Sequence, residues 1–441
     1  MPAYSDQAST AYLLAQYKNV RQATLDLCRP LSPEDLMVQS CPEASPSKWH
    51  LAHTSWFFET FVLAEFDRHY QPFHPDFRWL FNSYYNSLGE MPEKKLRASF
   101  SRPPLDAILA YREHVDVAIA GLLAQPVADE AARRIVLGLS HEQQHQELIA
   151  TDIKHALFTN PLHPAYLAQT DGQNSADVIA PPLEWMDFAG GLVEIGITPN
   201  PADVRTEAFA FDNETPRHRI YLQPFRLATR LVTCAEYLAF IEQNGYGRPE
   251  LWLSEGWAVM RAESWQAPLY WHRDDATESG WRIYTLHGFI PLEELSETPV
   301  CHISLFEADA FARWAGQRLP TEFEWEHAAA ASSLNNKSNN FLENGKLHPM
   351  PATPAEGLQQ IFGDAWEWTA SPYTGYPGYK PLPGALGEYN GKFMSSQMVL
   401  RGGSCVTPAT HIRATYRNFF TPATRWQFSG LRLAQDSKPT V

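Results

Sequence analysis

The stretch ARRIVLGLSHEQQHQELIATDIKHALF, residues 132–158, decides the fold of the first part of the chain. Its apolar residues recur at three- and four-residue intervals, which predicts one long amphipathic helix that begins near Ala128. His141 and His145 stand four residues apart, so they project from the same face of this helix and can share one metal ion. The stretch therefore predicts a helix that carries part of a metal site.

Three other segments before residue 160 have the same helical spacing, and a long aromatic connection contains FNSYY (81–85). Four amphipathic helices of this length predict an up-and-down bundle, whose core commonly holds metal ligands. The other three helices are expected at 12–27, from Ser47 through WHLAHTSWFFETFVLAEF (49–66), and at LDAILAYREHVDVAIAGLLA (105–124).

The chain changes character after the bundle. Residues 161–182 are polar and rich in proline, and beyond Leu183 short strands alternate with short helices and many turn residues. We therefore predict an α+β chain with a helical domain over 1–165, a linker over 166–182 and a mixed α+β domain over 183–436. A length of 441 residues leaves no room for a third large domain.

Composition narrows the function classes. The 35 basic and 50 acidic residues give a net charge of −15, which argues against nucleic-acid and anionic-membrane partners. No apolar run is long enough to span a membrane, and the first residues lack the pattern of a signal peptide. The five scattered cysteines are typical of reduced thiols. We expect a cytoplasmic protein, whose oligomeric state the sequence does not specify.

A second pair of histidines lies on the predicted second helix, in Trp49-His50-Leu51-Ala52-His53. Antiparallel packing can bring one of them opposite His141 and His145, and spacing alone does not choose between His50 and His53. Three imidazoles without a cysteine suit Zn, Fe, Ni or Cu, and three ligands leave positions open for catalysis.

Other interpretations of these histidines remain open at this point. His141-Glu142-Gln143-Gln144-His145 also fits HExxH, in which the glutamate is the general base of a zinc peptidase. The extended form with a third histidine is absent, and the helix continues without the turn that such enzymes require. Hydrogen-bonded structural histidines, or a binding module without catalysis, are the remaining alternatives.

The motifs together resemble a known family. WHLAHTSWFFETFVL with HEQQHQE resembles the DinB-like helical domain of the iron-dependent sulfoxide synthases of ergothioneine biosynthesis, the EgtB family. The second half resembles their formylglycine-generating-enzyme-like, or C-type-lectin-like, domain. The resemblance implies an Fe(II)- and O2-dependent oxidoreductase that joins a sulfur donor to imidazole C2 of hercynine. The stretches that carry it are FDNETPRHRIYL, VTCAEYLAFI, RLPTEFEWEHAAA, FGDAWEWTASPY, VLRGGS and FSGLRLA.

The resemblance also implies roles for individual residues. The family's iron ligands fall on His53, His141 and His145, so the resemblance prefers His53 to His50. Aromatic rings suit a trimethylammonium group through cation–π attraction. The residues that match hercynine-binding positions, or lie next to them, are Gln144, Asn418, Phe419 and Phe420.

The sulfur-donor side resembles the branch of the family that uses free cysteine. Phe420 and Thr424 stand where the branch that uses γ-glutamylcysteine has Asp and Arg. In the cysteine branch the tyrosine pair of FNSYY, here Tyr84 and Tyr85, supplies an active-site phenol, which can deliver a proton. Tyr389, in GEYNGKFM, is the nearest C-terminal alternative.

The positions expected to hold a substrate carboxylate depart from that branch. Met91 and Lys94 stand where arginines are usual, while Arg97 and Arg102 remain, and a lysine offers a point charge without a bidentate fork. Lys94 and Arg97 are therefore the candidates to bind the donor, with γ-glutamylcysteine or the selenosugar of selenoneine synthases as alternative donors. Formylglycine generation itself is excluded, because it needs a cysteine pair and this region has Cys405 alone.

Overall fold

The computed structural model describes residues 7–168, 178–198, 209–332 and 339–437, and the chain divides into two compact units. The first unit comprises Met1–Leu162, Thr198–Asp212 and Lys380–Gly391, and the second comprises His163–Ile197, Asn213–Tyr379 and Lys392–Val441. Two segments that the sequence placed in the second domain thus belong to the first unit. The predicted bounds at 165 and 183 stay predictions, and residues 169–177 of the predicted linker lie outside the described residues.

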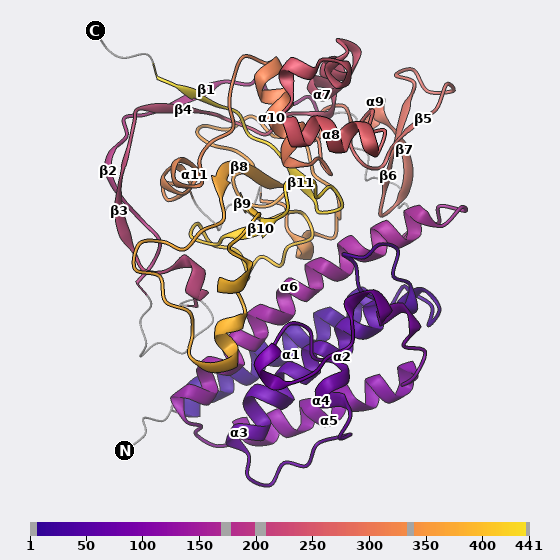
Figure 1. Cartoon of the computed structure of the whole chain (residues 1–441), viewed down its shortest axis with the longest axis vertical. Helices are drawn as coiled ribbons and strands as arrows, with labels where there is room; N and C mark the ends of the chain where they lie inside the picture. Colours follow the sequence, from indigo (N-terminus) through magenta and orange to yellow (C-terminus); the bar gives the residue numbers. More distant parts are fainter. Residues whose placement is uncertain (1–6, 169–177, 199–208, 333–338, 438–441) are drawn as a thin grey trace. The chain divides into compact units, whose positions relative to one another are not determined.

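The first unit is a helical bundle, whose helices within Met1–Leu162 are drawn indigo to magenta in Figure 1. Helix α2 packs against both α5 and α6, and α1 packs against α6, as the amphipathic spacing predicted. The long helices are α1 (Gln7–Cys28), α2 (Ser47–Phe58), α5 (Leu105–Leu123) and α6 (Asp129–Thr159). The shorter ones are η1 (Asp35–Met37), α3 (Ala64–Phe66), α4 (Phe77–Leu80), η3 (Asn86–Leu88), η4 (Lys94–Ser99) and η10 (Gly384–Glu388).

Two local features mark the region where α2 packs against α6. Gly138 lies in α6 where a Cβ atom would come within 2.5 Å of the Phe58 ring, so only glycine admits this ring beside the helix. After Phe58, helix α2 continues as a π-helical turn, η2 (Glu59–Leu63), a feature that is frequent near functional sites. The close approach sets the position of the α2 side chains relative to His141, one turn beyond Gly138.

The second unit is built from small sheets and short helices. Its sheets have the strand orders β1-β4-β12, β2-β3, β5-β6-β7 and β10-β9-β8-β11. The strands are β1 (Trp185–Phe188), β2 (Gly191–Ile195), β3 (His218–Leu222), β4 (Phe225–Ala228), β5 (Trp271–Arg273), β6 (Trp281–Thr285), β7 (Gly288–Pro291), β8 (Trp366–Pro372), β9 (Met398–Arg401), β10 (Asn418–Phe420), β11 (Ser429–Gly430) and β12 (Ala434–Asp436). The helices of eight or more residues are α7 (Cys234–Glu242), α8 (Ser254–Ala262), α10 (Leu305–Trp314) and α11 (Glu322–Ala329).

Three of these helices begin at capping boxes, which the sequence shows as a Ser or Thr followed three residues later by Glu. The Thr233, Ser304 and Thr321 hydroxyls each accept the backbone N–H of the residue three positions later, and that residue is a glutamate each time. The glutamate side chain accepts the backbone N–H of the cap in return, which satisfies two backbone donors at each helix start. This local chemistry explains why short helices form in a region of otherwise irregular backbone.

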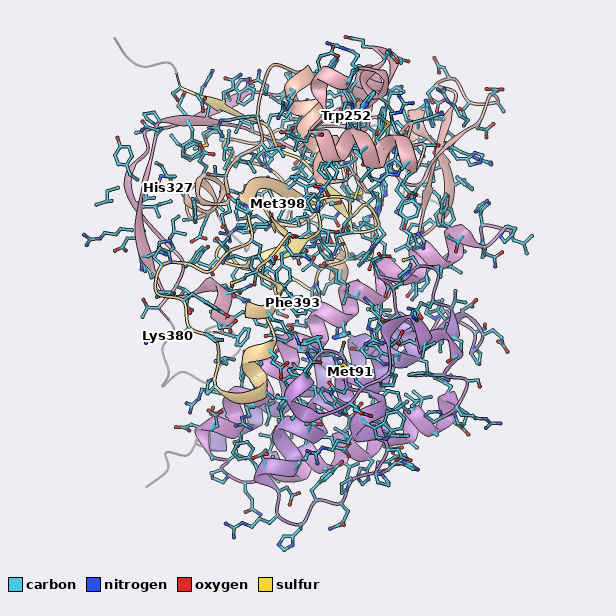
Figure 2. All side chains as sticks on the ribbon, viewed as in Figure 1. Met91, Trp252, His327, Lys380, Phe393 and Met398 are labelled. Atoms are coloured by element: carbon cyan, nitrogen blue, oxygen red, sulfur yellow. The ribbon has the colours of Figure 1, made fainter. Side chains whose placement is uncertain are left out.

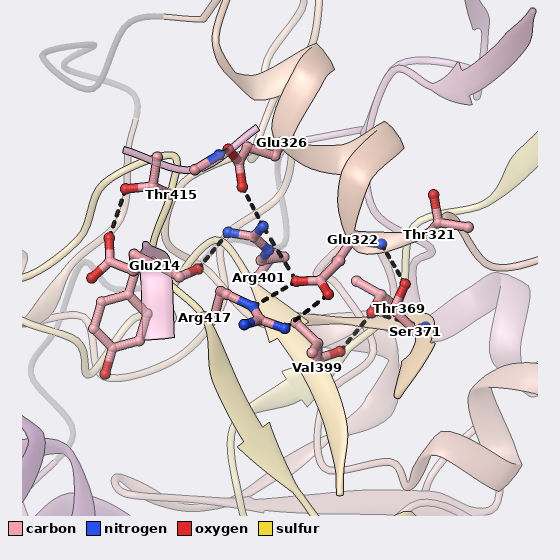
Figure 3. Close-up of polar contacts among 12 residues, drawn as sticks. Glu214, Thr321, Glu322, Glu326, Thr369, Ser371, Val399, Arg401, Thr415 and Arg417 are labelled. Carbon is pink, nitrogen blue, oxygen red and sulfur yellow. Dashed lines mark hydrogen bonds and ion pairs between the residues drawn. The ribbon is translucent and has the colours of Figure 1, made fainter. Parts of the chain in front are cut away.

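A buried ion network supports strand β10 (Figure 3). The Arg417 guanidinium donates from Nε and Nη2 to the Glu322 carboxylate at 2.8 and 3.0 Å. Arg401 donates to Glu326, one helical turn further along α11. Because Arg417 immediately precedes Asn418, this network holds the start of β10 against α11.

The prediction of an α+β chain, with an N-terminal helical bundle followed by a mixed domain, is confirmed. Among the described residues, none of the helices combines the length and the hydropathy that crossing a bilayer requires.

Candidate metal centre

Three buried histidines converge in the core of the bundle. His53 comes from α2, and His141 and His145 come from adjacent turns of α6. One ring nitrogen from each lies within 4.8 Å of the other two. The sequence predicted these three residues, and the structure brings them together.

The hydrogen bonds of the triad leave nitrogen atoms available inside it. His53 Nδ1 is 2.6 Å from the Phe81 carbonyl, so it donates there, and its Nε2 is buried with no partner among the described residues. His141 Nε2 and His145 Nε2 are 3.0 Å apart. If two histidine nitrogens bound one metal ion with bonds of about 2.1 Å and an N–metal–N angle of about 90°, the two nitrogens would lie about 3.0 Å apart. The donor set therefore fits a divalent transition-metal ion.

Burial keeps the three imidazoles uncharged. Desolvation lowers the pKa of His141 to about 3 and holds the pKa values of His53 and His145 well below their usual range. The charge of a neighbouring histidine lowers the pKa of His53 and His145 further. Neutral imidazoles present lone pairs, which is the form that binds metals.

His50, the alternative that spacing left open, lies outside the triad. Its Nδ1 is 2.7 Å from His145 Nδ1, and its Nε2 is 3.1 Å from Asp152 Oδ2. His50 therefore contacts His145 at Nδ1, the ring nitrogen that is not directed at His141, and the Asp152 carboxylate on α6. His53 instead faces the other two histidines.

Glu142 lies in a buried ion cluster with α1 and α5. Its carboxylate accepts from Arg21 Nη1 at 2.9 Å, from Arg112 and from the Thr24 hydroxyl at 2.6 Å. Burial would raise the pKa of Glu142, but Arg112 and Arg21 outweigh it and lower the pKa to about 2. A carboxylate held by two guanidinium groups is a poor base, so the structure argues against the zinc-peptidase interpretation of HExxH.

Tyr389 lies beside the triad although it is distant in the sequence. It belongs to the segment Lys380–Gly391 of the first unit, and its hydroxyl donates to Gln144 Oε1. Its ring centroid is 5.6 Å from that of His141 and 5.5 Å from that of Phe211. The family resemblance assigned the phenol to the FNSYY pair and left Tyr389 as the C-terminal alternative, and GEYNGKFM itself has no periodic pattern that signals packing against the bundle.

The residues on either side of Tyr389 form hydrogen bonds to two other segments of the first unit. The Glu388 carboxylate accepts the backbone N–H groups of Asn86 and Ser87 at 2.9 and 3.0 Å. Asn390 Nδ2 donates to Asp212 at 2.7 Å. These bonds on both sides of Tyr389 set its position in the first unit.

The two tyrosines of FNSYY have different surroundings. Their ring centroids are 4.6 Å apart. Tyr85 is fully buried against Trp56 and Phe61, whereas the Tyr84 ring lies 6.1 Å from that of Tyr389. Burial raises the pKa of both phenols, so both are protonated at neutral pH. Tyr84 is the member of the pair on the Tyr389 side.

Arg97 is a buried cation beside the triad. Its guanidinium lies 3.5 Å from the Trp49 ring centroid, and Trp49 stacks on His53 with ring centroids 4.5 Å apart. It donates to the Ser45 and Ser83 hydroxyls at 2.9 and 3.0 Å, and none of the described carboxylates forms an ion pair with it. Burial lowers the pKa of Arg97 to about 9.

The two positions that depart from the usual arginines do not supply a second buried cation. The Lys94 ammonium donates to the Glu43 carbonyl at the surface. Met91 is half-buried in the first unit (Figure 2). Arg97 is therefore the better placed of the two predicted donor-binding residues.

Asn418, Phe419 and Phe420 form β10 of the second unit. Asn418 Oδ1 accepts the Phe419 backbone N–H at 2.9 Å. The Phe419 ring stacks on Tyr373 at 4.0 Å, and the Phe420 ring meets Trp426 edge-on at 5.5 Å. These contacts are internal to the second unit, so the role of the three residues toward hercynine stays a prediction.

Comparison with known proteins agrees with this two-part organisation. The DinB superfamily matches residues 16–149, and the sulfatase-modifying factor enzyme 1-like domain matches residues 186–437. The formylglycine-generating enzyme of Streptomyces coelicolor is 27% identical over 286 residues, which cover 54% of this chain and 86% of that protein.

Two relatives match the chain nearly from end to end. The hercynine oxygenase of Mycolicibacterium smegmatis is 30% identical over 443 residues, covering 94% of this chain and 96% of that protein. The hercynine oxygenase of Mycolicibacterium thermoresistibile is 31% identical over 457 residues, covering 97% of this chain and 95% of that protein. The order of the two domains and this full-length similarity show that the chain belongs to the hercynine oxygenase family.

Proposed function

We propose that this chain is an Fe(II)- and O2-dependent sulfoxide synthase that joins cysteine to imidazole C2 of hercynine in ergothioneine biosynthesis. The observation that carries the proposal is the buried triad of His53, His141 and His145, whose nitrogen atoms converge in a group that includes no carboxylate or thiolate of the described residues. The names of the full-length relatives point to hercynine as substrate and to an oxygenase.

The proposed reaction balances with O2 as the oxidant. The C2–H bond of hercynine and the S–H bond of the thiol break, and a C–S bond forms. One oxygen atom ends in the sulfoxide and the other in water, so O2 accepts four electrons from the two substrates. A ferrous ion held by the three histidines would supply the activation of O2.

The residues around the triad have complementary tasks in this proposal. Gln144 and Tyr389 form a hydrogen-bonded pair next to His141 that can orient an imidazole. Burial raises the pKa of the Tyr84 and Tyr85 phenols, so both hold their protons at neutral pH, and Tyr84 is the one of the two whose ring lies near that of Tyr389. A protonated phenol at this place can deliver a proton as O2 is reduced.

Arg97 is the proposed anchor for the carboxylate of the sulfur donor. The hydrogen bonds that Arg97 donates to described side chains go to two hydroxyls, and an incoming carboxylate would give this buried guanidinium a direct ion-pair partner. Its stacking on Trp49, which stacks in turn on His53, places this charge one ring away from the triad. Asn418, Phe419 and Phe420 remain the proposed hercynine contacts of the second unit.

One incubation tests the proposal. The protein is loaded with Fe(II) under argon, mixed with hercynine and cysteine, and exposed to air, and the products are read by mass spectrometry with O2 uptake followed in parallel. We expect a hercynyl-cysteine sulfoxide and one O2 consumed per product. Parallel incubations replace cysteine with γ-glutamylcysteine or a selenosugar, and His141→Ala is the inactive control.

The outcomes separate the alternatives. Coupling of the selenosugar without coupling of cysteine would assign the chain to selenoneine synthesis. Peptide hydrolysis by the zinc-loaded protein, lost in Glu142→Gln, would restore the peptidase interpretation. A binding module without catalysis would give a different pattern. It would bind hercynine tightly, His141→Ala would leave this binding unchanged, and no donor would yield a product.

A further inference from the structure

His50 and Asp152 form a hydrogen-bonded chain that ends on one candidate metal ligand. Asp152 Oδ2 is 3.1 Å from His50 Nε2, and His50 Nδ1 is 2.7 Å from His145 Nδ1. All three side chains are buried. Asp152 Oδ2 also accepts the Ser45 backbone N–H at 2.9 Å, which holds the carboxylate in place.

The donors and acceptors along this chain determine where each proton lies. A neutral imidazole has one N–H group and one lone pair. Because Asp152 is an acceptor, His50 carries its proton on Nε2 and donates to the carboxylate. His50 Nδ1 is then the acceptor, so His145 carries its proton on Nδ1. His145 Nε2, which lies 3.0 Å from His141 Nε2, therefore holds a lone pair directed into the triad.

The three histidines of the triad are oriented by different means. His53 is fixed by a backbone carbonyl, that of Phe81, and His141 Nδ1 is buried with no partner among the described residues. His145 alone of the three is oriented by side chains in this way. Substitution can therefore remove the support of His145 without touching the triad itself.

We propose that His50 and Asp152 are positioning residues that fix the tautomer and ring orientation of His145 for metal binding. This inference rests on the metal site of the proposed function and extends it to two residues that do not touch the metal. Support of this kind, from a carboxylate through a hydrogen bond to a ligating histidine, is worth 10- to 100-fold in metal affinity in characterised sites.

The test measures metal affinity and stability separately. Co(II) is titrated into the metal-free full-length protein in competition with a chelator, and the visible absorption of bound Co(II) reports the ligand geometry. His50→Phe keeps the ring and removes both hydrogen bonds, and Asp152→Leu removes the acceptor at similar volume. We expect each variant to bind Co(II) about 10- to 100-fold more weakly, with an altered absorption spectrum.

A conservative variant and a matched control sharpen the result. Asp152→Asn keeps an oxygen that can accept from Ser45 and His50, so it should retain affinity within about threefold of the wild type. His114→Gln removes a histidine of the same bundle whose Nε2 bonds the Gln71 carbonyl, and it should leave the affinity unchanged. The double variant His50→Phe/Asp152→Leu should lose no more affinity than either single variant, because both break one chain.

The thermal unfolding of the metal-free forms distinguishes positioning from packing. A purely structural role would lower the melting temperature of His50→Phe while its folded fraction bound Co(II) as tightly as the wild type, and this result would overturn the inference. Equal losses in Asp152→Asn and Asp152→Leu would also contradict it. His141→Ala should abolish Co(II) binding at the triad. If the wild type shows no Co(II) binding that this substitution abolishes, the metal site of the proposed function fails, and this inference fails with it.

Discussion

Glu142→Gln should destabilise the first unit strongly while leaving the histidine triad in place. The Glu142 carboxylate is fully buried between Arg21 and Arg112 and accepts the Thr24 hydroxyl. An amide keeps one acceptor but removes the charge, and Arg112 has no other ion pair among the described carboxylates. The substitution therefore leaves a buried guanidinium without a counter-charge, which is the costly way to break a buried ion pair.

The magnitude follows from the pKa of Glu142. The neighbouring guanidinium groups lower this pKa from 4.5 to about 2. A difference of about 2.5 pKa units corresponds to about 3 kcal/mol, and breaking a buried ion pair typically costs about 3–5 kcal/mol. At about 2–4 °C per kcal/mol, the melting temperature of the unit should fall by roughly 6–20 °C.

The effect has a defined pH dependence. Because the folded-state pKa of this carboxyl is lowered, its stabilisation is fully present above about pH 5 and is lost as the pH falls from 4.5 toward 2. The difference in unfolding free energy between the wild type and Glu142→Gln should therefore be largest at pH 7 and shrink below pH 4.

Urea unfolding at pH 7 and at pH 3 measures this difference. Glu130→Gln is the matched control, since Glu130 lies on the same helix and forms exposed ion pairs with Arg133 and Arg134, worth less than about 1 kcal/mol. Equal stability of Glu142→Gln and Glu130→Gln would refute the reasoning. If Glu142→Gln were as stable as the wild type but lost a zinc-dependent peptide hydrolysis that the wild type performs, Glu142 would be a general base.

Three further outcomes are expected. Tyr389→Phe removes the hydroxyl that donates to Gln144 and should lower kcat roughly 100-fold with KM nearly unchanged; a normal kcat in a steady-state product assay would exclude a proton-delivery role. Arg97→Gln should raise KM for the thiol donor about tenfold or more and leave KM for hercynine within about threefold; equal changes in both would argue against a donor anchor. Burial raises the pKa of Asp364 to about 7, so the folded wild type should lose stability as the pH rises from 4 to 7. Asp364→Asn should lack this loss. The same change in melting temperature between pH 5 and pH 8 in the wild type and in Asp364→Asn would contradict this prediction.

The sequence alone determined the features that depend on local geometry. The 3.6-residue period of a helix places His141 and His145 on one face wherever that helix packs, and apolar periodicity marks α1, α2, α5 and α6. Motif resemblance added the order of the two domains. These predictions needed no knowledge of long-range contacts.

Only the tertiary structure decided which groups meet across the bundle. Both His50 and His53 fit the helical spacing, and the family resemblance preferred His53 without a physical reason. The packing of α2 against α6 supplies that reason, because it directs His53 into the triad and leaves His50 next to His145 outside it. The contacts of α6 with α1 and α5 turned Glu142 away from the metal centre. Tyr389 reaches the triad because its segment folds onto the bundle more than 200 residues later in the chain. Such contacts depend on how distant segments of the chain pack together, and the residue spacing within one segment does not determine that packing.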